Sequence, residues 1–118
     1  MQKGAQSELP VFIKWLEFQK VLTLMADRMP KKVRFTLTDR MINLSLNNVE
    51  SLVEARYSKN KIPHLAKVNI NIEKLRFLSR IGFEGQYVSS KDYERINIYL
   101  NETGQMIGAW IKERNSSQ

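Results

Sequence analysis

The chain has 118 residues and a formal net charge of +7 at pH 7, with 42% hydrophobic and 26% charged residues. These proportions suit one globular domain and exclude a disordered or collagen-like chain. Because there is no cysteine, disulfides, thiolate nucleophiles and cysteine-bound zinc or iron–sulfur centres are excluded as well.

Residues 1–7 are polar, and the apolar residues that follow are interrupted by Lys14, Glu17 and Lys20. This arrangement is neither the apolar region of a signal peptide nor a membrane span. We therefore expect a cytoplasmic protein with no membrane partner. A single domain is expected over residues 1–118, with residues 1–8 and 115–118 as flexible ends.

The first predicted helix lies between Pro10 and Pro30. Its apolar residues follow one another at the helical intervals of three and four: Val11, Trp15, Phe18, Leu22, Met25 and Met29. Pro10 suits the first turn of a helix, where a missing N–H costs nothing. Pro30 is expected to end the helix by moving Met29 out of helical geometry.

The second predicted helix runs from about residue 36 or 38 to residue 56. Its apolar stripe consists of Ile42, Val49 and Leu52 together with the small Ser45. Beside this stripe lie Leu37, Met41 and Leu44. The asparagines Asn43, Asn47 and Asn48 make this helix the most polar of the chain. Residues 33–37 alternate between apolar and polar types, but this strand signal is short and weak.

The third predicted helix begins near Pro63 and ends at Gly82 and Gly85. It carries two apolar seams, one formed by Leu65, Val68, Ile72 and Leu75 and the other by Ile70, Phe77 and Ile81. Two seams on one helix indicate contact with more than one neighbour, either within the same bundle or in another subunit.

The fourth predicted helix begins at Ser89, which with Asp92 resembles a capping box. Gly104 and Gly108 leave one face open to the close approach of a neighbouring helix. Its apolar positions are Tyr93, Ile96, Leu100, Thr103, Ile107 and Trp110, and we expect Trp110 to be part of the core, as Leu75 is. Four helices with short connections predict an all-α, up-down-up-down antiparallel four-helix bundle.

Motifs of catalysis are missing from the sequence, including a Gly-rich phosphate loop, HExxH and G-x-S-x-G. The one histidine, His64, lies beside Pro63 at a helix start, where a surface or capping role is commoner than a ligand role. A bundle metal site needs Glu-x-x-His pairs, and the chain has none. Glu50 and Glu54 share a helical face that we expect to be solvated. The sequence predicts neither an enzyme nor a cofactor.

Basic residues gather at the predicted turns and on the third helix. Lys31, Lys32, Arg34 and then Arg40 surround the first turn, and Arg56, Lys59 and Lys61 surround the second. On the third helix Arg76 and Arg80 are four apart and Lys67 and Lys74 are seven apart, so each pair projects to one side.

Such spacing is typical of phosphate contacts, and the charge surplus favours a polyanionic partner. The alternative is a set of solvated faces, in which Arg76 and Arg80 pair with Glu73, Glu84 or another subunit and the surplus charge only aids solubility. We expect four aromatic residues to lie in the core rather than to act as base-stacking platforms, because they fall on apolar seams: Trp15, Phe18, Phe77 and Trp110.

Several stretches resemble a known family. Residues 29–38, followed by Asn48-Val49-Glu50, are similar to a pattern of the four-helix-bundle proteins encoded in ribosomal RNA intervening sequences. The stretches 75–80 and 104–111 resemble one branch of that family, the accessory variability determinant (Avd) proteins of diversity-generating retroelements. Residues 49–52 read Val-Glu-Ser-Leu and depart from the Ile-Ala-Glu-Gly of the intervening-sequence branch. The matching stretches lie between Trp15 and Arg114.

The Avd resemblance implies a ring-like homopentamer of four-helix bundles with a basic surface and no active site. It also implies association with the reverse transcriptase of the same element and with its template RNA, in support of mutagenic cDNA synthesis and homing. It carries over Arg76 and Arg80 as basic contacts. The residues expected to bind nucleic acid or the reverse transcriptase are Arg76, Arg80, Lys67, Lys74, Lys31, Lys32 and Arg34.

The alternative function is that of a bundle of the intervening-sequence branch, acting as a protein-interaction or general nucleic-acid-binding module. We expect nucleic-acid binding with little sequence preference, because the chain has neither a recognition helix nor a ribonucleoprotein aromatic pair.

Overall fold

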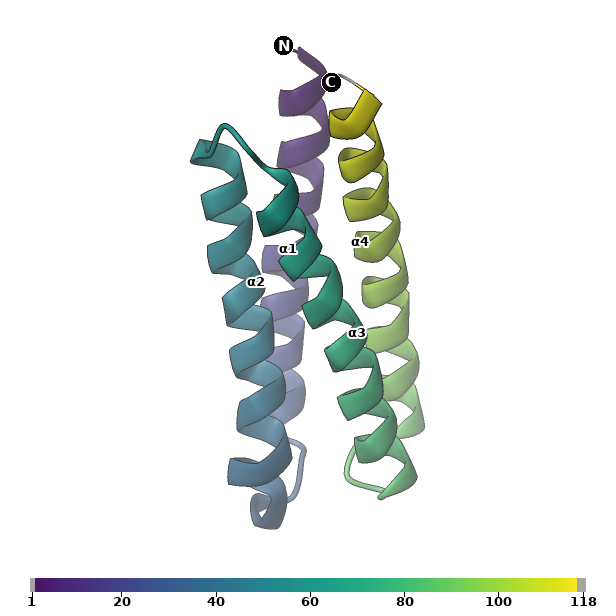
Figure 1. Ribbon diagram of the computed structural model, residues 1–118. Coiled ribbons are helices and arrows are strands. Elements are labelled where there is room, and N and C mark those ends of the chain that lie inside the picture. Colours follow the sequence, from purple (N-terminus) through teal and green to yellow (C-terminus); the bar gives the residue numbers. More distant parts are fainter. Residues whose placement is uncertain (1, 117–118) are drawn as a thin grey trace.

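The computed structural model describes residues 2–116, with side chains from residue 8 onward. Its long elements are α1 (Gln2–Ala26), α2 (Asp39–Tyr57), α3 (Ile62–Glu84) and α4 (Ser90–Ser116) (Figure 1). Two short helical turns, η1 (Lys31–Val33) and η2 (Arg34–Thr38), join α1 to α2. No strand is present between residues 2 and 116, so the prediction of an all-α chain is confirmed for this range.

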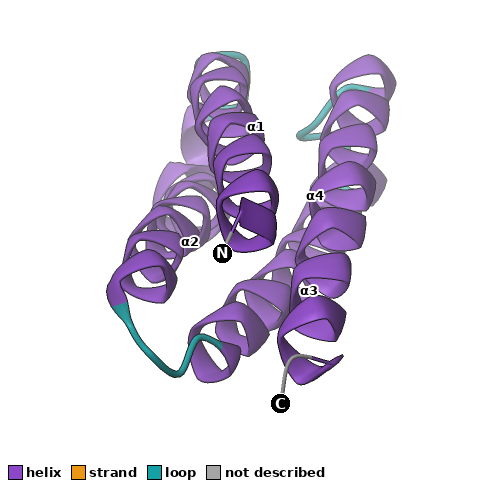
Figure 2. Ribbon diagram, turned by 90° about the horizontal axis from the view of Figure 1, so that it is seen from above, coloured by secondary structure: helices purple, strands orange, loops and turns teal. Residues whose placement is uncertain are grey.

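The helices run alternately up and down in an elongated bundle measuring 47 × 22 × 19 Å along its principal axes (Figure 1). Each helix packs against the next one in the chain, and α4 closes back onto α1. The view along the bundle shows that α1 and α3 lie on opposite corners (Figure 2). Both connections α1–α2 and α3–α4 lie at one end, while the α2–α3 connection and the termini lie at the other.

The core side of α1 is the predicted one, and its apolar stripe is buried from Val11 to Met29. The side chain of Trp15 ties α1 to α2, because its Nε1 donates a hydrogen bond to the carbonyl oxygen of Ser45 at 2.8 Å. Both predicted bounds of the helix are wrong: α1 begins at Gln2, so Pro10 lies inside the helix rather than in its first turn, and α1 ends at Ala26, after which residues 27–29 continue as hydrogen-bonded turns. Pro30 therefore follows a turn rather than the helix itself.

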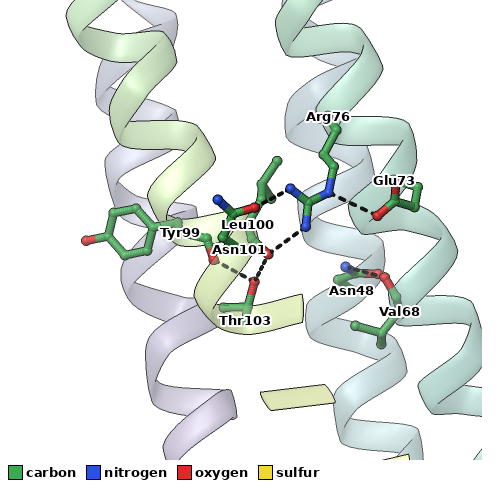
Figure 3. Close-up of polar contacts among 8 residues, drawn as sticks. All are labelled: Asn48, Val68, Glu73, Arg76, Tyr99, Leu100, Asn101 and Thr103. Carbon is green, nitrogen blue, oxygen red and sulfur yellow. Dashed lines mark hydrogen bonds and ion pairs between the residues drawn. The ribbon is translucent and has the colours of Figure 1, made fainter. Parts of the chain in front are cut away.

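The buried side of α2 is rotated from the predicted stripe. Its buried residues are Met41, Ser45, Asn48, Ser51, Leu52 and Ala55, whereas Ile42 and Val49 lie at the margin of the core. Asn48 is tolerated there because its Nδ2 donates to the carbonyl oxygen of Val68 at 3.2 Å (Figure 3) and its Oδ1 accepts a 3.0 Å hydrogen bond from Asn71. A buried amide with its partners in place costs little, which explains an asparagine in this position.

Replacing Asn48 by alanine should lower the free energy of unfolding by about 1–3 kcal/mol, because the buried amide of Asn71 then loses its acceptor. Urea unfolding followed by circular dichroism measures the change. Asn47→Ala is the matched control, since the neighbouring side chain is exposed and its removal should change stability by less than about 0.5 kcal/mol. Equal effects in the two variants would contradict a structural role for the Asn48–Asn71 pair.

Of the two predicted apolar seams of α3, one is buried and the other is exposed. Leu65, Val68, Ile72 and Leu75 are buried, as predicted. Ile70, Phe77 and Ile81 are all more than half exposed, so the prediction that Phe77 belongs to the core is wrong for the single chain. The physical reason is that α3 occupies a corner of the bundle and, among the described residues, packs mainly against α2 and α4.

The turn from α3 to α4 is shaped by local contacts. Gly85 caps α3, and Gly82 is buried where an added Cβ would lie 2.7 Å from Cγ2 of Val88. The Oγ of Ser89 accepts a 3.1 Å hydrogen bond from the backbone N–H of Asp92, as the predicted capping box requires. The carboxylate of Asp92 does not bond back; it instead accepts two hydrogen bonds from Arg28, at 2.9 and 3.1 Å.

The predicted core positions of α4 are buried from Ile96 to Trp110, and Tyr93 is partly buried. The prediction that Gly104 and Gly108 admit a neighbouring helix is wrong within the chain. An added Cβ at Gly104 would lie 3.3 Å from Nη2 of Arg76, and one at Gly108 would have no described atom within 4 Å. Gly104 therefore makes room for a side chain, not for a helix backbone.

The two ends of the chain are helical as far as they are described. Residues 2–8 lie in α1 and residues 115–116 lie in α4, while residues 1, 117 and 118 lie outside the described range. Flexibility of these ends stays a prediction. Within residues 2–116, none of the helices has both the length and the hydropathy needed to cross a bilayer.

Candidate nucleic-acid interface

Lys31, Lys32 and Arg34 lie at the end of the bundle where α1 is connected to α2 (Figure 1). The connector is anchored by the buried side chains of Val33 and Leu37, which leaves the three basic side chains exposed. The Nζ of Lys32 lies 5.3 Å from the centroid of the Tyr87 ring, within cation–π range. Among the described side chains none of the three cations forms an ion pair, so this end of the bundle carries uncompensated positive charge.

The basic residues of α3 are divided between two sides of the helix. Asn71 hydrogen-bonds to Asn48 and thereby marks the side that faces α2. Lys67 precedes Asn71 by four residues and Lys74 follows it by three, so helical geometry places both lysines on the α2 side. Arg76 contacts α4 instead. Each predicted pair shares a side, but the structure separates the lysine pair from the arginine pair.

Arg76 is held by several partners and reaches from α3 across to α4 (Figure 3). Its Nε donates to Oε2 of Glu73 at 3.0 Å, its Nη1 donates to Oδ1 of Asn101, and its Nη2 donates to the carbonyl oxygen of Leu100 at 3.3 Å. Its side chain is about one-third exposed (31%), and the missing side chain of Gly104 makes room for it. Arg76 therefore links the two helices besides carrying charge.

Arg80 lies one turn later and is far more exposed, at 63% of its side chain. Its Nε donates to Oε2 of Glu84 at 3.0 Å, and this hydrogen bond raises the pKa of the guanidinium. The carboxylates that hold Arg76 and Arg80 are the two named in the alternative interpretation of the sequence, Glu73 and Glu84. In the single chain both arginines are thus already paired, whereas the three cations of the α1–α2 connector are not.

A groove of about 610 Å³ runs between α2 and α3 and extends to η2. Among its lining residues are two cations, Arg40 and Lys74, and two exposed aromatic rings, Phe35 and Phe77; the others are Asp39, Asn43, Leu44, Asn47 and Leu78. In the part of the chain with described side chains, neither Arg40 nor Lys74 forms an ion pair. The groove thus joins unpaired positive charge, amides and aromatic surface in one place.

Sequence reasoning placed Lys74 among the candidate residues but missed the groove. In the sequence, Phe35 stands out only as part of the stretches 29–38 and 33–37, and the spacing of Phe77 predicts a core position. The signal available in the sequence is the spacing of Lys74 and Phe77, which lie three apart and so share a helix face. Their partners on α2 come from a helix more than 20 residues away, and only packing brings these together.

A second cavity of about 420 Å³ lies near the end that holds the termini, lined by Glu8, Leu9, Phe12, Leu52, Val53, Arg56, Tyr57 and Trp110. It is apolar apart from Glu8 and Arg56. The Nε1 of Trp110 is buried and has no hydrogen-bond acceptor among the described residues. Trp110 itself is 1% exposed and belongs to the core, as predicted.

His64 has local partners that explain its position. Its Nε2 and Oγ of Ser58 are hydrogen-bonded at 3.1 Å, and its Nδ1 lies 3.6 Å from a carboxylate oxygen of Glu54. These contacts join the start of α3 to the end of α2. Among the side chains described from residue 8 onward, no three histidine, aspartate or glutamate residues gather as metal ligands would.

A comparison with the profiles of known protein families identifies the family of this chain. The profile of the bAvd-like family matches residues 13–114, which is most of the chain. The chain belongs to the bAvd-like family. This confirms the resemblance to Avd proteins seen in the sequence, and it favours the Avd branch over the intervening-sequence branch. No match to the chain is found among curated proteins.

Membership of the bAvd-like family makes the chain an Avd-type protein, from a family of accessory proteins that is not known to be catalytic. The match extends from the middle of α1 to the last turn of α4 and includes Arg76, Arg80 and all residues lining the α2–α3 groove.

Proposed function

We propose that the protein is a non-catalytic Avd accessory protein that binds the reverse transcriptase and the template RNA of a diversity-generating retroelement. In this role it supports mutagenic cDNA synthesis and homing, and it works in the cytoplasm. The observation that carries the proposal is the family match over residues 13–114. The net charge of +7 adds support, as do the unpaired cations of the α1–α2 connector and the α2–α3 groove. A polyanion binds most favourably where positive side chains have no carboxylate partner.

Co-purification with the reverse transcriptase encoded beside the gene tests the proposal. We expect the two proteins to elute together and to retain RNA that, when sequenced, maps to the template of the element. A reverse transcriptase gene and a pair of near-identical repeats are expected next to the gene. Elution of the protein alone, with no neighbouring reverse transcriptase gene, would support the intervening-sequence alternative instead.

We propose further that the protein assembles into a ring-like homopentamer. Large apolar side chains are exposed on α1 (Leu9, Ile13, Leu16 and Leu24) and on α3 (Ile70 and Ile81). These helices lie on opposite corners of the bundle (Figure 2), so the two apolar surfaces face different directions. Two different complementary surfaces make head-to-tail contacts, which close into rings, whereas a twofold dimer uses one surface against itself.

Size-exclusion chromatography with light scattering is expected to give five times the mass of the chain at micromolar concentration. A matched pair of charge substitutions identifies the surface. Ile70→Glu, on the exposed apolar surface of α3, should dissociate the ring, and Ile98→Glu, similarly exposed on α4 and outside both apolar surfaces, should leave it intact. A monomer mass for the unmodified protein would refute the assembly.

The double change Arg76→Ala/Arg80→Ala tests the two residues carried over from the family. We expect weaker binding of RNA and reverse transcriptase, with a salt slope about one unit smaller for each phosphate that the variant no longer binds. Because Arg76 also ties α3 to α4, its removal should lower stability by about 1 kcal/mol, whereas removal of Arg80 should be nearly neutral.

The single variants therefore separate structure from binding. Arg80→Ala removes a charge with almost no structural cost, so any decrease of its affinity reports on binding alone. A double variant that stays folded and oligomeric and binds both partners as before would remove Arg76 and Arg80 from the site.

A further inference from the structure

The α2–α3 groove displays two aromatic rings that the bundle leaves largely uncovered. Phe35 is 82% exposed on η2, and Phe77 is 64% exposed on α3. Both line the same groove, whereas Ile70 and Ile81, which are also exposed on α3, do not. Leu44 and Leu78 pack against the core and form its apolar base. The groove can therefore receive a flat apolar ring.

The charges of the groove specify what kind of ring it suits. Arg40 and Lys74 are unpaired among the described side chains, and Asp39 is the one carboxylate in the lining. Asn43 and Asn47 add amides that can both donate and accept hydrogen bonds. An apolar peptide segment would leave both cations without a counter-charge. A nucleotide supplies the flat ring, polar edges and a negative phosphate in one unit.

We propose that the α2–α3 groove binds single-stranded nucleic acid, with unpaired bases stacked on Phe35 or Phe77 and phosphates contacted by Arg40 and Lys74. The inference rests on the proposed function and assigns its RNA contact to the α2–α3 groove. Single strands fit because the bases of a duplex are stacked on one another and do not offer their faces to a protein ring. Aromatic stacking tolerates any base, as expected for binding with little sequence preference.

Two 12-nucleotide probes separate stacking from charge: oligouridylate, and an abasic oligomer with the same number of phosphates. The unmodified protein should bind the base-bearing strand about 5- to 160-fold more tightly, the range that one stacked base supplies. Phe77→Leu and Phe35→Leu keep an apolar side chain but lack the aromatic ring. If a base stacks on the ring that is removed, the variant should lose the preference for the base-bearing strand. Ile81→Leu, on the same helix and outside the groove, is the matched control and should retain it.

A fluorescent variant reports the contact directly. Trp15 and Trp110 are both 1% exposed, so Phe77→Trp adds an exposed indole to two buried ones. Base-bearing probe should quench the added fluorescence and the abasic probe should not. Lys74→Gln and Arg40→Gln should each lower the salt slope by about 0.7, the value of one phosphate contact on a single strand, while leaving the preference for bases intact.

The outcomes distinguish the inference from the function on which it rests. If the unmodified protein binds neither probe, the proposed RNA binding fails and the groove assignment fails with it. If it binds both probes equally, or if both leucine variants keep the preference for bases, the groove assignment alone is wrong. If Phe77→Leu instead dissociates the oligomer and leaves the base preference of the subunits unchanged, the occupant of the groove is a second copy of the chain.

Discussion

Replacing Leu75 or Trp110 by alanine is expected to lower the free energy of unfolding by about 2–5 kcal/mol. Leu75 is 0% exposed at the centre of the buried seam of α3, and Trp110 is 1% exposed on the core side of α4. Each truncation removes apolar surface that folding takes out of water and leaves a void that the surrounding helices fill only in part. Both residues were expected in the core from their spacing alone.

Urea unfolding at a fixed protein concentration measures these decreases, because an oligomer gains stability with concentration. Ile98→Ala is the control, since Ile98 lies on α4, as Trp110 does, and is 52% exposed. It should cost less than about 1 kcal/mol. If Trp110→Ala instead left the melting temperature unchanged and abolished RNA binding, Trp110 would belong to a binding site and not to the core.

The affinity for single-stranded RNA is expected to fall about 100-fold between 50 and 200 mM monovalent salt. The figure follows from about five contacted phosphates, one for each subunit of the proposed pentamer, at a slope of about −0.7 per phosphate on a single strand. The physical cause is the release of counterions when the cations of the surface neutralise phosphates. Fluorescence anisotropy with a labelled RNA, repeated across the salt range, measures the slope.

A second RNA of the same length and a shuffled sequence is the control for this measurement. It should bind with a similar affinity and the same slope, since phosphate contacts carry no sequence information. A strong preference for one sequence combined with a shallow slope would indicate direct recognition of bases and would contradict a mainly electrostatic interface.

The number of helices, their order and most of the core could be predicted from the sequence, because burial in a bundle follows the helical period. Trp15, Leu65 and Leu100 are buried where intervals of three and four residues place them. The family was also accessible from the sequence, since the residues that resemble Avd proteins lie within the range that the family profile matches.

Asn48 and Phe77 show what periodicity does not determine. Asparagine is an unfavourable core residue by itself, and its burial depends on Asn71, a partner that lies 23 residues away and is brought opposite by the packing of α2 on α3. Phenylalanine is a favourable core residue, but at position 77 it lies on the outer side of a corner helix with no neighbour to cover it. In both cases the environment comes from another helix.

In the candidate site, too, the environment of each residue depends on the neighbouring helices. Spacing alone predicts that Arg76 and Arg80 share one side of a helix and that Lys67 and Lys74 share one side, because residues three, four and seven apart are close on a helix. Tertiary structure decided that Arg76 bonds to α4 and that both arginines are paired with carboxylates of α3, while Lys74 lies in the α2–α3 groove with Arg40 and two aromatic rings. The spacing of residues in the sequence determines the angle between two side chains of one helix. Which neighbouring helix each side chain contacts is determined only when all four helices pack together.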